Sequence, residues 1–304
     1  MFNNFLKEFN AKRILLSMEL DLATTITNIL NNFDFCIEYC LKNNILPDRR
    51  QIQHCPICHH QMTYYNSCHH WKCHNNQCNT TRSMLYPFEI KTNNFQNYIS
   101  SLLLFCADIP IHTCIKLFNI SSQIIQRNYA HFRDILYNIY RNEMQIQNLS
   151  FHVQIDESLF GKRKYDRGRI LKSQTWVFGA CDDNPGGRVY MVAVEKRNED
   201  TLLPIIQSWC PAGSIINSDC WNAYNNIPAY GFHHFTVNHS ENFVNPATKE
   251  HTQRIESLWH QCKSWMNNHF YNKSSETEKY IGEWCFRYNH QKDMRSILNE
   301  ILNK

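Results

Sequence analysis

Three acidic residues lie in surroundings that suit metal-assisted phosphoryl transfer. Asp156 and Asp219 each follow an apolar, strand-like stretch, and Glu256 lies in the helix-like segment HTQRIESLWHQC. A carboxylate at the end of a core strand is costly unless it is paired or bound to a metal. Carboxylates that converge from different elements can hold two Mg²⁺ or Mn²⁺ ions, which activate an oxygen nucleophile and stabilise the leaving oxygen. We predict that Asp156, Asp219 and Glu256 are catalytic metal ligands.

The residues alone leave other interpretations open. Asp219 could instead cap the short helix that begins at WNAY, and Glu256 could be an ordinary solvated helical residue. Glu157 points to the opposite face of the strand from Asp156, so we expect it to be structural, although it is also a possible neighbour of the metal ligands.

Four cysteines have the spacing of a zinc ribbon. A CPIC motif is followed, after fourteen residues, by a second pair with four residues between its members. Each pair places two thiolates on a tight turn, and the two turns together complete a tetrahedral Zn²⁺ site. Cys68, His69 or His70 could replace one ligand, and the alternative is a set of unrelated reduced thiols. The predicted structural zinc ligands are Cys55, Cys58, Cys73 and Cys78.

The segment from about 151 to 270 resembles the catalytic domain of the Merlin superfamily of DDE transposases and of related bacterial insertion-sequence transposases. The resemblance is carried by IDESLFGKRKYDRGR, WVFGACD, TLLPII, INSDCWNAY and VNHSENFVNPATKEHTQRIESLWHQCK, and by the 36 residues between Asp219 and Glu256. It implies an RNase H-like α/β core, with a mixed five-stranded sheet and helices. The implied activity is Mg²⁺-dependent cutting of transposon ends and their joining to target DNA.

The hydrophobic pattern predicts the elements of such a core. Three antiparallel strands, a helix, a parallel strand and further helices follow the RNase H-like order, and the turn at 183–187 predicts a hairpin. The predicted strands are 151–156, 174–182, 188–194, 214–218 and 233–237, and the predicted helices are 198–209, 221–226, 251–268 and 275–290.

The chain is expected to have four parts: a helical lead-in (1–50), a zinc ribbon (51–91), a helix-turn-helix-like segment (92–148) and the catalytic domain (149–304). In the third part, helices at about 95–107 and 111–118 precede a longer helix capped by Ser121 or Ser122, which is the helix-turn-helix pattern. The alternative is a helical linker that packs on the catalytic core. The residues of the long helix expected to contact DNA are Gln123, Gln126, Arg127, Asn128, His131 and Arg133.

Other basic residues are expected to contact DNA near the catalytic carboxylates. The run 161–169 carries five cations directly after Asp156, where they would attract the phosphate backbone; the alternative is a solvated hairpin. Lys263 lies two helical turns after Glu256 and is a further phosphate contact, whereas His239 and His251 are weaker candidates. The cations of the run are Lys162, Arg163, Lys164, Arg167 and Arg169.

The resemblance implies double-stranded DNA as the partner, as terminal inverted repeats and as target, and a homo-oligomer on that DNA. The sequence has no apolar run that approaches the roughly 20 residues needed to span a membrane. Its N-terminus lacks the continuous apolar stretch of a signal peptide. We expect a nuclear location in a eukaryote and otherwise a cytoplasmic one at the nucleoid. Two alternatives remain: a host-adopted DNA-binding protein without catalysis, and a zinc-ribbon transcription factor with an unrelated helical body.

Overall fold

A computed structural model of the chain describes residues 21–46, 54–65, 70–83, 92–161, 174–237, 252–269 and 276–303. Contacts divide the chain into two compact units, Met1–Asn128 and Tyr129–Lys304. Each unit has its own buried residues. Within the described ranges, no helix is both long enough and apolar enough to cross a bilayer.

The N-terminal unit combines helices with a small sheet. Residues 21–31 are helical and are followed by α2 (Phe33–Lys42), in which Cys36 and Cys40 are both buried. The side chain of Gln96, on α3 (Thr92–Cys106), donates hydrogen bonds to the carbonyl oxygens of Ile29 and Leu30 at 2.8 and 3.1 Å. The strands β1 (Met62–Tyr65), β2 (His70–Cys73) and β3 (Thr81–Ser83) form an antiparallel sheet.

The helix-turn-helix-like pattern is present, but two of its predicted DNA contacts are wrong. Helix α4 (Ile111–Phe118) ends at Asn119, which has a left-handed backbone, and α5 (Ser122–Ile146) begins after a short turn. Asn128 is buried and donates to the hydroxyl of Ser101 at 3.1 Å. Arg133 is 4% exposed and pairs with Glu283. Both side chains face protein, so they cannot contact DNA.

The C-terminal unit contains a five-stranded sheet of order β6-β5-β4-β7-β8. Strands β4 (His152–Phe160), β5 (Thr175–Asp182) and β6 (Val189–Val194) pair antiparallel, whereas β7 (Ile215–Ser218) and β8 (His233–Thr236) run parallel to β4. This is the mixed sheet of an RNase H-like fold, as the sequence predicted. The turn at 183–187 joins β5 to β6 at the expected position.

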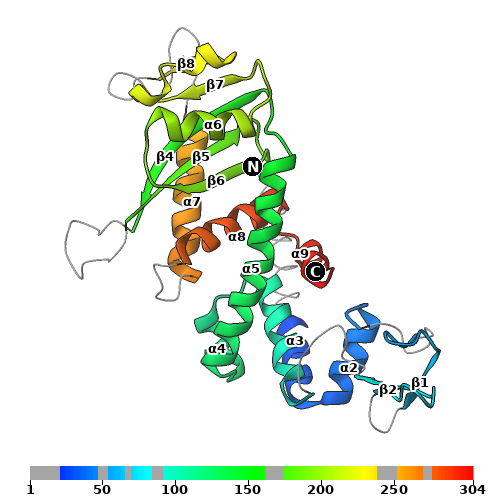
Figure 1. Cartoon of the computed structure of the whole chain (residues 1–304). Helices are drawn as coiled ribbons and strands as arrows, with labels where there is room; N and C mark the ends of the chain where they lie inside the picture. The colour runs from blue at the N-terminus through cyan, green and yellow to red at the C-terminus, as the bar shows by residue number, and fades with distance from the viewer. Residues whose placement is uncertain are drawn as a thin grey trace, which may run out of the picture. The chain divides into compact units, whose positions relative to one another are not determined.

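Helices cover both faces of this sheet (Figure 1). On β5, the ring of Phe178 stacks on Trp209 of α6 (Glu199–Trp209), with centroids 5.6 Å apart, while the neighbouring Gly179 lies against Trp259 of α7 (Gln253–His269). Successive strand residues point to opposite faces, so α6 and α7 lie on opposite sides. Helices α8 (Thr277–Asn289) and α9 (Met294–Leu302) complete the unit, and the predicted helix at 221–226 consists of 3₁₀ turns, η2 (Asn222–Tyr224) and η3 (Ile227–Tyr230).

Two side chains form hydrogen bonds with backbone groups on the outer edge of β6, which is an edge strand of the sheet. The hydroxyl of Tyr140 accepts from the Met191 N–H at 2.7 Å and donates to the Met191 carbonyl at 3.0 Å. The Asn289 amide makes the same pair of bonds with Val189, at 2.9 and 3.1 Å. Unpaired backbone groups on an edge strand can pair with a strand of another chain. The two side chains occupy the backbone groups of Val189 and Met191 and so prevent such pairing there.

Candidate active site and zinc site

Asp156 lies within β4 rather than at its end, which corrects the sequence-based expectation. Parallel pairing with β7 stops at Gln154, but antiparallel pairing with β5 continues to Phe160. The carboxylate therefore projects from a strand that has lost its neighbour on the β7 side. One oxygen accepts from the Glu157 N–H at 2.8 Å, and the other accepts from the indole N–H of Trp259 at 3.0 Å.

A glycine makes the contact between Trp259 and Asp156 possible. Gly179 is the β5 residue paired with Asp156. A Cβ atom placed on Gly179 would lie 2.6 Å from the Trp259 ring, closer than van der Waals contact allows. The indole is 5% exposed and also packs edge-on against Phe160, with centroids 5.9 Å apart. The sheet thus provides a recess for the ring that orients Asp156.

Asp219 follows β7 and orders the turn that carries it away from the sheet. Its Oδ1 accepts from the Trp221 N–H at 3.0 Å; the N-cap of η2 is Trp221, so Asp219 orders the preceding turn and is not the helix cap. The Trp221 indole N–H donates to the Arg197 carbonyl at 3.1 Å. The Arg197 guanidinium lies 3.6 Å from the centroid of the Trp176 ring and 4.9 Å from that of Trp221.

Glu256 lies in the first turn of α7 and is exposed. Its Oε1 accepts from the hydroxyl of Thr252 at 3.2 Å. The residue is helical, as the sequence predicted, and lies at the edge of the face that α7 buries with Ile255, Leu258 and Trp259.

The three acidic residues share one electrostatic environment. Burial raises the pKa of Asp156 to about 6; its hydrogen bonds oppose this rise, and the negative charges of Asp219 and Glu256 add to it. Their oxygen atoms are not all within 4.8 Å of one another; among the described residues, only a cysteine group is that compact. Two metal ions about 3.5–4 Å apart need a wider set of ligands. A desolvated carboxylate with two like charges nearby is chemically suited to hold such ions.

Lys263 extends from α7 to β4. Its Nζ donates to the Ser158 hydroxyl at 2.6 Å and lies 5.0 Å from the centroid of the Phe160 ring. Burial lowers the pKa of Lys263, and the negative charge of Asp156 partly opposes that change. The amine is therefore held beside the carboxylates, where the sequence predicted it.

The structure describes only some of the other residues that were predicted to contact DNA or metal. Arg127 is exposed and Gln126 half-buried near the start of α5, as a DNA contact requires. The basic run Lys162, Arg163, Lys164, Arg167 and Arg169, together with His239, His251, Cys68 and His69, lies outside the described residues.

Sequence reasoning missed two side chains that hold acidic residues of the site, Trp259 and Tyr224. The buried Trp259 donates its indole N–H to Asp156. Glu157 was expected to be structural; its Oε1 accepts from the buried hydroxyl of Tyr224 at 2.7 Å. Burial raises the pKa of Glu157 to about 7; the Tyr224 bond opposes this rise, and the nearby Asp156 and Asp219 charges add to it. The sequence signal for a role of Glu157 at this site was its position directly after Asp156 in IDES.

The four predicted cysteines form the compact group. Their Sγ atoms lie within 4.8 Å of one another, with Cys55–Cys78 at 3.6 Å and Cys58–Cys73 at 3.4 Å. Zn–S bonds of about 2.3 Å in a tetrahedron place sulfur atoms roughly 3.8 Å apart. Backbone N–H groups of the two turns also point at the sulfur atoms, among them that of His60 at Cys58, which lowers the pKa of that thiol to about 6. The donor set fits Zn²⁺, and the described ligand candidate His70 is not in the group.

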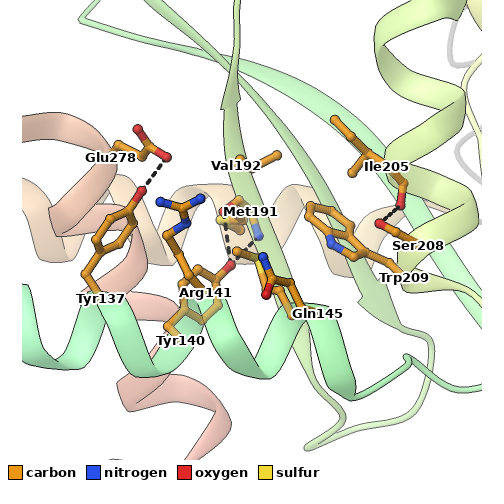
Figure 2. Close-up of a pocket in the computed structure, with 11 residues that line it drawn as sticks. Tyr137, Tyr140, Arg141, Gln145, Met191, Val192, Ile205, Ser208, Trp209 and Glu278 are labelled. Atoms are coloured by element: carbon orange, nitrogen blue, oxygen red, sulfur yellow. Dashed lines mark hydrogen bonds between the residues drawn. The ribbon is translucent and has the colours of Figure 1, made fainter.

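A separate pocket of about 310 Å³ lies beside β6, between residues of α5, α6 and α8 (Figure 2). Tyr137 donates to Glu278 at 2.5 Å across one side, and Trp209 lines the other. None of the three predicted catalytic acids lines this pocket, so it is not part of the candidate active site.

One comparison with known proteins, a match to a family model, supports the resemblance found in the sequence. Residues 148–289 match the family described as the ISXO2-like transposase domain. No curated protein is matched by sequence. A solved structure titled as a pre-cleavage Mos1 transpososome is similar over 68% of this chain and 78% of that chain, at 10% identity and a TM-score of 0.30.

Proposed function

We propose that this chain, whose residues 148–289 match the ISXO2-like transposase domain, cuts the ends of a DNA element and joins them to target DNA. The observation that carries the mechanism is the placement of Asp156. Its partly desolvated carboxylate is oriented by Trp259 and lies in the field of Asp219 and Glu256. Such a set of carboxylates suits two-metal phosphoryl transfer.

The acids have distinct proposed roles. Asp156 would contact both Mg²⁺ or Mn²⁺ ions, Asp219 one, and Glu256 the other. When bound, the ions would activate a water or a DNA 3′-OH and stabilise the leaving oxygen of an in-line displacement. The protein's own contribution is orientation: the Glu157 N–H and the Trp259 indole fix Asp156, and the Thr252 hydroxyl holds Glu256.

DNA binding is assigned to several parts of the chain. The zinc ribbon and the start of α5, with Gln126 and Arg127, would recognise terminal inverted repeats. The basic run 162–169 and Lys263 would contact phosphates near the catalytic acids. A homo-oligomer would hold the two ends of the element together.

The test is a cleavage and strand-transfer assay on DNA that contains the element's ends, with Mg²⁺ or Mn²⁺ added. Asp156→Asn, Asp219→Asn and Glu256→Gln should each abolish both reactions and leave end binding largely unchanged. Removing a charge from the cluster also relieves repulsion, so these variants should not lose stability. Glu195→Gln, at an exposed position in the same unit, is the matched control.

Two results would contradict the proposal. Normal end binding by the wild-type chain without metal-dependent cleavage would favour a host-adopted DNA-binding protein. Near-full activity of Glu256→Gln would show that the third ligand is another acid, such as Glu241 or Glu250.

A further inference from the structure

The strand that carries Asp156 is joined to the segment that follows Asp219 by one buried hydrogen bond. Tyr224 lies in η2, five residues after Asp219. Its side chain is fully buried, and its hydroxyl donates to Glu157 Oε1 at 2.7 Å. Asp156 and Asp219, the two proposed metal ligands, are therefore connected through their neighbours, Glu157 on β4 and Tyr224 after β7.

This bond lies where backbone pairing between β4 and β7 has ended. The parallel ladder between these two strands stops at the Gln154–Asn217 pair, before either aspartate. Strand β7 continues to pair with β8 as far as Ser218–Thr236, and beyond Ser218 a side-chain bond links the Asp219 segment to β4. The Asp219 Oδ1–Trp221 bond orders the turn itself, and the Tyr224–Glu157 bond ties the turn to β4.

Glu157 faces away from the proposed metal site. In the antiparallel register it pairs with Phe178, whose ring contacts α6, whereas Asp156 pairs with Gly179 on the α7 side. Its carboxylate is nevertheless half-buried and within the field of two other carboxylates. A neutral acceptor could receive the Tyr224 bond without that repulsion. The Tyr224 hydroxyl therefore needs an acceptor at this position, and a glutamine could also supply one.

We infer that Glu157 is a positioning residue, which acts through Tyr224 to set the separation between Asp156 and Asp219 that two metal ions require. The inference rests on the proposed two-metal function. Partners that orient metal ligands typically change metal affinity by about 10–100-fold when removed, and this bond orients one ligand relative to another.

The test measures Mn²⁺ binding by the full-length protein without DNA, by electron paramagnetic resonance, together with the Mn²⁺ concentration for half-maximal cleavage. Tyr224→Phe removes only the hydroxyl and should weaken Mn²⁺ binding about tenfold. Glu157→Ala should have a similar effect. Glu157→Gln keeps an acceptor and should recover most of the affinity. The double variant Tyr224→Phe/Glu157→Ala should lose no more than either single one, because both remove the same bond.

Tyr230→Phe is the matched control, since Tyr230 is an exposed tyrosine in η3 of the same segment. Folded Tyr224→Phe protein with wild-type Mn²⁺ affinity would overturn the inference. Loss in Glu157→Gln as large as in Glu157→Ala, with Tyr224→Phe unaffected, would also overturn it, because Glu157 would then be a ligand. If Asp156→Asn itself binds Mn²⁺ normally, the proposed metal site is wrong instead.

Discussion

The strongest stability prediction concerns a buried charge cluster in the C-terminal unit. Glu283 accepts from the Nε of Arg133 at 2.6 Å, and from the Nε and one terminal nitrogen of Arg287 at 2.9 and 2.8 Å. All three side chains are at most 4% exposed. The Arg133 guanidinium also lies 3.6 Å from the centroid of the Tyr280 ring. Glu283→Ala would leave two cations buried without their carboxylate.

The size of the effect follows from burial. Removing one member of a buried ion pair costs about 3–5 kcal/mol. In a unit the size of Tyr129–Lys304, 1 kcal/mol corresponds to about 2–4 °C in Tm. Glu283→Ala should therefore lower Tm by roughly 6–20 °C. Lys279→Ala breaks the Lys279–Asp134 pair between the same two helices, which is 41% and 46% exposed, and should lower Tm by no more than about 4 °C.

The same cluster gives a pH dependence. Burial alone would raise the pKa of Glu283, but the charges of Arg133 and Arg287 overcome it and hold the pKa below its ordinary value. The stabilisation is therefore present above the unfolded-state pKa and lost as pH falls through the lower folded-state value. Calorimetry or circular dichroism at several pH values measures both effects. A Glu283→Ala shift no larger than that of Lys279→Ala would refute the reasoning.

Three further predictions concern other parts of the chain. Metal analysis should find one Zn²⁺ per chain, which Cys55→Ser removes and His70→Ala does not; the reverse pattern would show that a histidine is the ligand. Neutralising Lys162–Lys164 should weaken binding to all DNA sequences alike and reduce the salt slope by about 2–3, whereas a sequence-specific loss would argue against phosphate contacts. Tyr140→Phe should cost about 1–3 kcal/mol in denaturant unfolding, because the Met191 N–H loses its partner in a buried position; an unchanged midpoint would show that the edge needs no cap.

The sequence predicted the elements better than their contacts. Apolar alternation placed all five strands of the catalytic sheet to within one residue or so, except that β4 continues to Phe160 beyond its predicted end at Asp156. That end depends on which neighbour continues to pair: β7 stops early, while β5 does not. The hydrophobic pattern of a single strand cannot show that its two neighbouring strands stop pairing with it at different residues.

Side-chain partners distant in the chain were the main source of error. Arg133 has the composition and helical position of a DNA contact, and only its pairing with Glu283 on α8 shows that it faces the core. The bond between Glu157 and Tyr224 likewise joins residues that are 67 positions apart. Residue type and spacing therefore selected the carboxylates and cysteines as candidates, while the groups that hold them required the fold.

The recess at Gly179 restricts how this domain can be redesigned or diversify. Glycine is a poor strand residue, so replacing it is an obvious choice when a β-sheet is to be made more stable. Here any Cβ would displace the Trp259 ring and thereby release the oxygen of Asp156 that the ring holds. Positions 179 and 259 should consequently covary among homologues: a larger residue at 179 requires a smaller one at 259, and such a chain must orient its first aspartate by other means.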